Sequence, residues 1–266
     1  MVKKIETELI FDLEAVVDPI LGPILIRNKI KYPWSLGRPF SEGHNQKFLR
    51  LIPQMAGAGF FSGDNFEHKL HLDRNAAVSL ESAGASLILP GRKGPALINW
   101  EFHLKENARL ILDAEPYLLI NNAELIIKTK IFIDRSSIFL ASDFLGHCFP
   151  DEVNYGSWQN EMKLYIENEE LFFIDSQKAL STSFKRSEKI LGGYPSIANV
   201  WLIAPDLDCS FIKKIIPKIN SHYAVTELRD GLGQVVRLLA NDVGLLRDDV
   251  KSVLREVKKG VEPLYH

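Results

Sequence analysis

The chain has 266 residues and a formal net charge of −2, and 46% of its residues are hydrophobic. That hydrophobic fraction is enough for a sizeable core and argues against intrinsic disorder. The near-zero charge supplies no field that would attract nucleic acid or an acidic membrane, so neither is expected as a partner. No run approaches the roughly 18 apolar residues of a membrane-spanning helix.

The N-terminal residues and the cysteines indicate in which cellular compartment the protein is expected. Met1–Glu6 lacks the apolar core of a signal peptide. The two cysteines, Cys148 and Cys209, form no CxxC pair, so a disulfide framework is not expected and a reducing cytoplasm is favoured. Because no linker, charge run or low-complexity segment splits the chain, we expect one domain over residues 1–266.

Most of the chain has the pattern of short β-strands. Alternating or apolar runs bounded by Gly, Pro, Asn and Asp predict strands. These runs are Lys4–Phe11, Gly22–Ile30, Phe48–Ile52, Phe66–Leu72, Ala76–Leu89, Leu97–Leu104, Arg109–Leu112, Tyr117–Ile120, Leu125–Ile133 and Ile138–Ala141. The prolines and glycines between Pro33 and Asn45 predict a loop. No residue motif recurs along the series.

Two further strand pairs complete the β-structure. Each is a predicted hairpin, the first around Asn168 and the second around Asp230 and Gly231. The paired runs are Met162–Ile166 with Leu171–Ile174 and Tyr223–Leu228 with Gln234–Leu239. Strands at roughly even spacing are typical of sandwiches, barrels and β-helices. The predicted class is therefore mainly β, with many short strands in a stacked, β-helix-like or sandwich arrangement.

Helices are predicted only near the C-terminus, since no helical period precedes residue 205. Cys209–Ile219 is one candidate, which Pro217 would end early. Val243–Val257 is a stronger candidate, because its apolar residues share one face and its charged residues cover the rest. Asp242 is the expected N-cap of this second helix.

Pro53–Asp64 is the most distinctive stretch, because it holds three glycines between two predicted strands. Gly57, Gly59 and Gly63 can take positive φ without a Cβ penalty, and we expect this of Gly59 or Gly63. The carboxylate of Asp64 is expected to accept hydrogen bonds from the loop's own amides. The stretch therefore predicts a tight connection between two strands.

A glycine loop also raises the possibility of a nucleotide site, but the pattern argues against one. The dinucleotide fingerprint must open a helix, whose N-terminus holds the pyrophosphate, and here a strand pattern follows. No Gly-Lys-Ser/Thr sequence follows either, which excludes a P-loop.

The histidines form no recognised metal motif. His68 and His71 are three residues apart on a predicted strand, so their side chains should point to opposite faces. The densest group of potential ligands is His147 and Cys148 with the carboxylates of Asp143, Asp151 and Glu152. Imidazole suits nickel, but without clustered ligands a structural loop is the ordinary interpretation.

Carboxylates near the middle of the chain leave a second class of function open, that of an enzyme with paired catalytic acids. Asp113, Glu115 and Glu124 could supply the paired acids of a glycosidase. Solvated carboxylates at strand ends are the ordinary alternative. The chain has no Gly-x-Ser-x-Gly motif and no recognised Cys–His frame, so nucleophilic catalysis is not indicated.

Several segments, in order, resemble the urease accessory protein UreD family, also called UreH. Ala58–Asp64 resembles its Gly-Gly-x-x-Gly-Gly-Asp signature, with Ala58 and Ser62 in place of glycines. Leu110–Pro116 loosely resembles its Leu-Glu-Trp-Leu-Pro region, and Gly233–Leu239 resembles its C-terminal strand. The order and spacing match over nearly the whole chain, which is identified as a divergent member.

The resemblance implies a β-rich stacked fold and a chaperone rather than an enzyme. Members of the family form a complex with the accessory protein UreF and the GTPase UreG. They bind apo-urease and help deliver nickel to it, along an internal water-filled passage. An ion in transit needs modest affinity at each ligand, so no tightly bound cofactor is expected. Asp64, Glu115 and His147 are the candidate weak nickel ligands.

Two alternatives to the urease role remain. One is a β-rich carbohydrate-active enzyme that uses the carboxylates above. The other is a UreD-like scaffold that serves a different partner. Three departures from the family pattern motivate the second alternative. Ala58 and Ser62 stand in place of glycines, Leu87 stands where the family has a lysine, and His147 where it has an arginine.

The C-terminal helix carries the candidate partner surface. Arg247, Lys251 and Arg255 follow at four-residue spacing, which places a basic stripe on one face. The resemblance implies that such a surface binds a UreF-like helical protein, and a merely solvated helix face is the alternative. Exposed charges contribute little to stability, so reversing Arg247 and Arg255 is expected to leave the melting temperature nearly unchanged.

Overall fold

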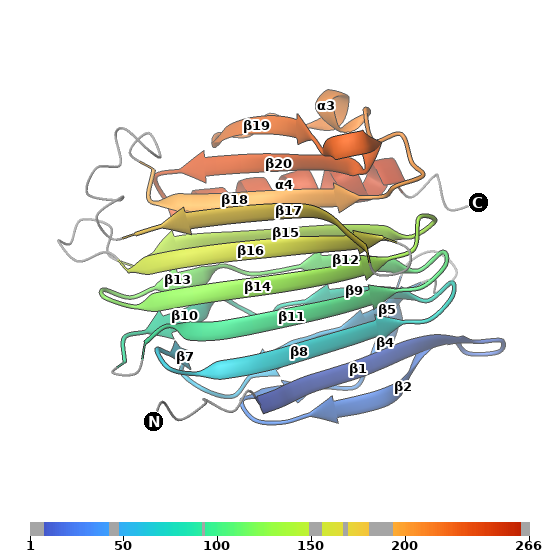
Figure 1. Ribbon diagram of the computed structural model, residues 1–266, viewed down its shortest axis with the longest axis horizontal. Coiled ribbons are helices and arrows are strands. Elements are labelled where there is room, and N and C mark those ends of the chain that lie inside the picture. The colour runs from blue at the N-terminus through green and yellow to red at the C-terminus, as the bar shows by residue number, and fades with distance from the viewer. Residues whose placement is uncertain are drawn as a thin grey trace.

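The computed structural model describes residues 8–42, 48–91, 94–148, 156–166, 170–180 and 194–261. Two β-sheets lie face to face, and a long C-terminal helix packs behind one of them (Figure 1). The chain winds between the sheets, so that successive strands stack on one another in a solenoid-like manner. The predicted mainly β, stacked class is confirmed.

The front sheet has seven strands, and its five central strands run parallel to one another. Antiparallel hairpins close it at both ends. Its order is β17 (Glu170–Ala179), β16 (Ser157–Ile166), β14 (Glu124–Ile133), β11 (Ala96–Leu104), β8 (Asn65–Leu72), β1 (Glu8–Asp18) and β2 (Gly22–Ile30).

The back sheet has eleven strands, eight of them on its main path. The main path is β19 (His222–Glu227), β20 (Gly233–Ala240), β18 (Ser196–Ile203), β15 (Ile138–His147), β12 (Arg109–Asp113), β9 (Ala77–Glu81), β5 (Phe48–Leu51) and β4 (Phe40–Glu42). A side ladder joins through β15 and contains β13 (Tyr117–Leu119), β10 (Ser86–Leu89) and β7 (Phe60–Phe61).

Four smaller elements complete the described fold. A separate two-stranded sheet pairs β3 (Trp34–Leu36) with β6 (Pro53–Met55). A 3₁₀ turn, η2 (Arg229–Gly231), joins β19 to β20. The helices are α3 (Ile212–Ile215) and α4 (Val243–Val261). No described helix is long and apolar enough to cross a membrane.

The corners between the two sheets repeat a short motif. Asn75, Asn107 and Asn122 all take positive φ, near +60°, and each is followed by a fully buried alanine. Asn tolerates the left-handed conformation better than most residues. At the next corner Ser137 Oγ donates to Lys105 O at 2.6 Å and so links two coils. The expectation that no motif recurs is therefore wrong, because the repeat is only two residues long in coils of about 30 residues.

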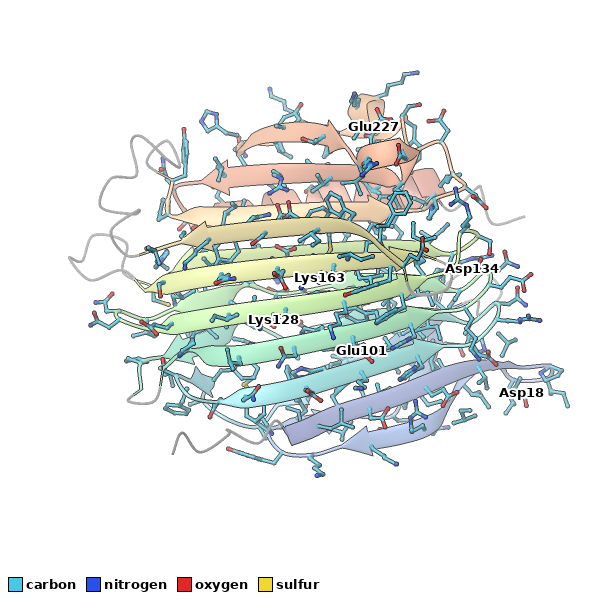
Figure 2. The ribbon with its side chains drawn as sticks, in the orientation of Figure 1. Asp18, Glu101, Lys128, Asp134, Lys163 and Glu227 are labelled. Atoms are coloured by element: carbon cyan, nitrogen blue, oxygen red, sulfur yellow. The ribbon has the colours of Figure 1, made fainter. Side chains whose placement is uncertain are left out.

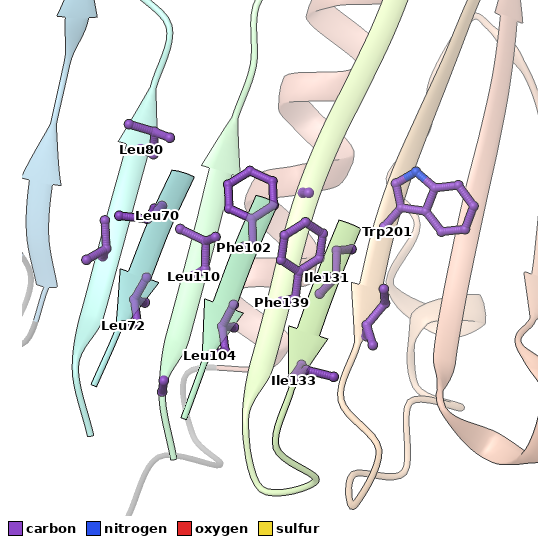
Figure 3. Close-up of a cluster of buried hydrophobic side chains, with 14 of the residues drawn as sticks. Leu70, Leu72, Leu80, Phe102, Leu104, Leu110, Ile131, Ile133, Phe139 and Trp201 are labelled. Carbon is purple, nitrogen blue, oxygen red and sulfur yellow. The ribbon is translucent and has the colours of Figure 1, made fainter. Parts of the chain in front are cut away.

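The space between the sheets is filled by apolar rows (Figure 3). Leu70, Phe102 and Ile131 are register neighbours on the front sheet and are fully buried. Leu110 and Phe139 are register neighbours on the back sheet and belong to the same cluster. The alternating pattern places these side chains inward, and their burial drives the two sheets together.

Helix α4 covers the outer face of the back sheet with one apolar stripe. The amide of Leu245 donates to Asp242 Oδ1 at 2.8 Å, which confirms the expected N-cap. The predicted helix over Val243–Val257 is confirmed and extends to Val261. The predicted Cys209–Ile219 helix is reduced to the four residues of α3, which ends ahead of Pro217.

Both predicted late hairpins are confirmed. Three other predictions about where strands and loops begin and end were wrong. The loop between Pro33 and Asn45 contains β3 and β4, because its prolines and glycines flank two short strands. The glycine stretch contains β6 and β7 and is not one tight connection. The run Ala76–Leu89 is split into β9 and β10, where the chain passes from one back-sheet ladder to the next.

Candidate functional site

A cavity of about 80 Å³ lies between the two sheets, which is room for several water molecules. Aromatic and aliphatic side chains form most of its wall. The wall also contains three carboxylates, which belong to Glu81, Glu115 and Asp143. These acids come from separate strands and loops of the back sheet, so no local sequence motif unites them.

Asp143 is the most deeply placed of the three. It lies in the inward row of β15, four residues from the buried Phe139. Asn199 Nδ2 and Trp201 Nε1 donate to its two oxygens at 2.7 and 2.8 Å. Burial raises the pKa of Asp143 to about 6, although these hydrogen bonds favour the charged form. Its charge therefore changes close to neutral pH.

A chain of polar side chains leads from Asp143 to the edge of the front sheet. Gln177 Nε2 donates to Asn199 Oδ1 at 3.2 Å and to Asp175 Oδ2 at 2.8 Å. Asp175 forms an ion pair with Arg237 on β20. These contacts join the front sheet to the back sheet and place a second carboxylate beyond Asp143.

Glu115 belongs to a cluster of four charges between the back sheet and α4, and of these four residues only Glu115 lines the cavity. Arg247 holds it in a two-pronged contact, with nitrogen–oxygen distances of 2.6 and 2.8 Å, and Lys251 lies 3.2 Å away. Lys251 also pairs with Asp113. Burial opposes the charged form of Glu115, but the hydrogen bonds and charges of Arg247 and Lys251 lower its pKa overall.

This cluster changes the interpretation of two candidate sites. Arg247 and Lys251 turn toward the back sheet and dock α4 on it, whereas Arg255 is exposed. Asp113 and Glu115, proposed above as paired catalytic acids, are tied to these cations, and Glu124 is exposed. A carboxylate held by a guanidinium group remains charged, so it is a poor proton donor.

The glycine stretch has the geometry expected of it. Gly59 and Gly63 take positive φ, at +155° and +98°, which confirms the prediction, whereas Gly57 is not among the residues with positive φ. The amide of Phe61 donates to Asp64 Oδ2 at 2.8 Å, also as expected. A Cβ on Gly59 would lie 2.3 Å from Leu87 O, so this glycine lets β7 approach β10.

The histidines have structural surroundings. His68 is buried and His71 is half-buried on the opposite face of β8, as their spacing predicted. His68 Nε2 accepts from Trp34 Nε1 at 2.9 Å, and burial lowers its pKa to about 4. His147 is buried, with Nδ1 3.0 Å from Pro195 O, and burial lowers its pKa as well.

The candidate nickel ligands are not brought together. Asp64 precedes β8, Glu115 follows β12 and His147 ends β15. Within the described ranges no group of three His, Cys, Asp or Glu side chains is placed to hold a metal. Asp151 and Glu152, named with His147 above, lie outside the described residues.

The sequence did not predict the series of polar side chains that links Asp143 to Arg237. One signal was available, because Asp143 interrupts an apolar run in β15. A carboxylate at an inward strand position is rare unless it has a role or a partner. Its partners were not predictable, because Asn199, Trp201 and Asp175 lie on strands far along the chain.

Comparison with known proteins identifies the kind of protein. The model of the UreD urease accessory protein family matches residues 22–264. The stacked two-sheet fold and this match define the class as a urease accessory protein. The chain belongs to the UreD urease accessory protein family.

Individual relatives cover most of the chain. The urease accessory protein UreD of Acetivibrio thermocellus is 25% identical over 240 residues, which are 85% of this chain and 87% of the relative. UreD of Staphylococcus epidermidis is 23% identical and covers 79% of this chain and 78% of its own. UreD of Mycolicibacterium smegmatis is 22% identical over 88% of this chain and 84% of its own. These relatives are named accessory proteins and not enzymes, and their family supports a role in urease maturation.

Proposed function

We propose that this protein assists the insertion of nickel into apo-urease, in a complex with UreF-like and UreG-like proteins. The family supports urease maturation as the setting. The observation that carries the finer proposal is the cavity between the sheets, with its separated carboxylates at Glu81, Glu115 and Asp143. Carboxylate oxygens bind divalent cations, and separated ones bind weakly enough to release them.

Asp143 is the residue that this proposal depends on most. Its pKa near 6 means that it ionises close to neutral pH, so it can exchange a proton for a cation with little cost. Glu115 is less available to bind a cation, because Arg247 and Lys251 already neutralise its charge. Asp64 and His147 are retained only as weak candidates, since both are engaged with backbone groups.

The test is reconstitution of urease from purified components. Apo-urease, the UreF-like protein, the UreG-like GTPase and this chain are incubated with nickel, and metal content and urease activity are measured. We expect nickel incorporation to depend on this chain and to fall when Asp143→Asn is used. Glu227→Gln, an isosteric change on the exposed strand β19, serves as the matched control (Figure 2).

Two results would contradict the proposal. Equal nickel incorporation with and without the chain would reject a role in insertion. Full activity of the Asp143→Asn variant would reject the cavity as the route while leaving the role in maturation intact. A tight, stoichiometric nickel site in the isolated chain, measured by titration calorimetry, would also argue against passage through weak ligands.

A further inference from the structure

The two sheets do not end at the same level near the C-terminal end of the stack. The front sheet ends at β17, which lies over β18 and β20 of the back sheet. Gln177 on β17 donates to Asn199 on β18 at 3.2 Å. Asp175 on β17 forms an ion pair with Arg237 on β20. The back sheet continues past this line to one more strand, β19 (Figure 1).

The inner face of β19 is left uncovered by the front sheet. Ala224 and Thr226 on β19 are register neighbours of Arg237 and Val235 on β20. Val235 belongs to the core between the sheets, so its side of β20 and β19 is the inner one. Both Ala224 and Thr226 are nevertheless exposed. We call these two residues the shelf.

The open edge of β17 lies beside the shelf. Residues 173–179 of β17 pair with β16 without a register shift. An edge strand presents unpaired N–H and C=O groups, with which one further strand can pair. Neighbouring strands are about 4.8 Å apart and packed sheets are about 10 Å apart. A strand added to β17 would therefore lie over the shelf and complete the front layer.

The outer face of β17 indicates which side chains such a strand would carry. Asp175 and Gln177 point inward to the back sheet, so Ile174 and Lys178 face outward. Ile174 is 47% exposed, and the exposed Lys178 forms no ion pair with a described residue. An aliphatic side chain beside Ile174 and a carboxylate beside Lys178 would complement this edge.

The extra strand of the back sheet argues against a second copy of this chain at the β17 edge. Two copies paired through β17 would share one continuous front sheet. Each back sheet extends past β17, so the two β19 strands would have to occupy the same space. A single extended segment meets no such obstacle.

We propose that the β17 edge and the shelf bind an extended segment of a partner protein as an added β-strand. Aliphatic and acidic side chains of the segment face outward beside Ile174 and Lys178, and small hydroxyl side chains face the shelf. Main-chain hydrogen bonds to the edge supply affinity, and the alternate side chains supply specificity. The inference goes beyond the proposed function and does not depend on it.

The probe is the capped peptide Asp-Thr-Val-Thr-Val-Thr-Asp, whose pattern is the same in both chain directions. Its binding to the full chain is followed by NMR through the chemical shifts of backbone amides. We expect saturable shifts along β17 and on β19. The control peptide has the same composition but adjacent valines, which point to opposite faces of a strand. It should bind at least about fivefold more weakly, because one valine loses its apolar contact.

Three variants separate the charge and the shelf from general effects. Lys178→Glu should weaken binding about threefold, and a peptide with Lys in place of Asp should restore it. Lys128→Glu is the matched control, because Lys128 is exposed on the same sheet but on β14, away from the edge (Figure 2). It should bind like the wild type. Ala224→Trp fills the space over the shelf and should abolish binding. Circular dichroism verifies that each variant is folded.

Several outcomes would overturn the inference. No shifts at millimolar peptide, or equal binding of the two peptides, would show that the edge does not recognise this pattern. Equal shifts on β2, the other end of the front sheet, would show unspecific pairing. Protection of every β17 amide from hydrogen exchange in the isolated chain would assign the edge to the chain itself. A dimer in sedimentation that Ile174→Asp dissociates would assign the edge to a second copy.

Discussion

Two neighbouring rows of inward side chains on the front sheet differ sharply in chemistry. One row consists of Leu70, Phe102 and Ile131, which are fully buried and make only apolar contacts between the sheets. The next row, two residues back on the same strands, contains His68, Trp100 and Thr129. Trp100 and Thr129 line the cavity, and Phe102 lies at the boundary between the two rows, because its side chain also forms part of the cavity wall.

The difference teaches that strand pairing alone does not decide what fills the interior. The parallel ladder continues without interruption through both rows. Stability is concentrated in the apolar row, where removal of surface from water is complete. The adjacent row borders the cavity and contains polar as well as apolar side chains. One scaffold thus supports a close-packed half and a half that surrounds a cavity.

The largest expected effect comes from emptying the apolar row. Phe102→Ala should destabilise the protein by about 3–5 kcal/mol, because it removes buried surface and leaves a cavity. Thr129→Ala, in the neighbouring row, should cost about 1 kcal/mol, since its site is already open to the cavity. Urea unfolding measures both. Equal losses would remove the distinction between the two halves.

The half of the interior that surrounds the cavity should affect the pH dependence of stability. The folded pKa of Asp143 is raised to about 6, so the folded state binds more protons than the unfolded state between about pH 4 and pH 6. Stability from Asp143 is therefore present at acid pH and is lost as the pH rises through 6. This rise in the pKa of Asp143 corresponds to about 3 kcal/mol in the free energy of unfolding.

His68 acts in the opposite sense over a similar range. Its folded pKa, lowered to about 4, makes the folded state bind fewer protons, so stability rises with pH between about 4 and 6.5. A comparison with Asp143→Asn isolates the carboxylate. As the pH rises from 4 to 7, the stability of the variant relative to the wild type should increase, as measured by the midpoints of urea unfolding. Parallel curves would show that Asp143 does not titrate in this range.

A smaller effect is expected where α4 contacts the back sheet, and it revises an expectation from the sequence. Arg247→Glu should lower stability by about 1–3 kcal/mol, because it leaves the nearly buried Glu115 beside a like charge. Reversal at Arg247 was expected from the sequence to leave the melting temperature unchanged. Arg255→Glu, on the exposed side of α4, should still do so, within about 0.5 kcal/mol. Indistinguishable melting temperatures would remove the docking role of Arg247.

The smallest effect concerns the side ladder. Gly59→Ala should cost about 1 kcal/mol or more, because a Cβ at this positive φ would lie 2.3 Å from Leu87 O. Gly37 has no atom within 4 Å of the position of a Cβ, and it is the matched control. Gly37→Ala should be neutral within about 0.5 kcal/mol in thermal denaturation. A neutral Gly59→Ala would mean that β7 can move away from β10.

Much of the fold was predictable because its determinants are local. Alternation along β8 and β14 and the amphipathic pattern of α4 each report which face is buried. The coil repeat was missed because one left-handed Asn per corner leaves little trace in the sequence. The short strands β3 and β7 were missed because two or three residues do not establish a period.

The site was less predictable, because it depends on contacts between distant strands. Asp143 and Asn199 meet where β15 pairs with β18, and Asp175 is linked to them through Gln177 only when the two sheets are placed face to face. The basic stripe of α4 was visible as a helical spacing, but the spacing does not say what the stripe faces. Arg247 and Lys251 face Glu115 and Asp113, whose position across the fold the sequence did not reveal.

The stacking of coils also bears on how the chain folds. Apart from β1, which pairs with β8, each parallel strand pairs with a strand about 30 residues away. Closing such a loop is slow relative to forming a helix or a hairpin. A coil has no partner until its neighbour is in place, so assembly is expected to proceed coil by coil as synthesis advances. Until β16, β18 and α4 are added, the growing end exposes unpaired strand edges and an apolar face. Chains that stall at this stage are prone to aggregate, so coexpression with a partner that covers the nascent edge should raise the yield of folded protein.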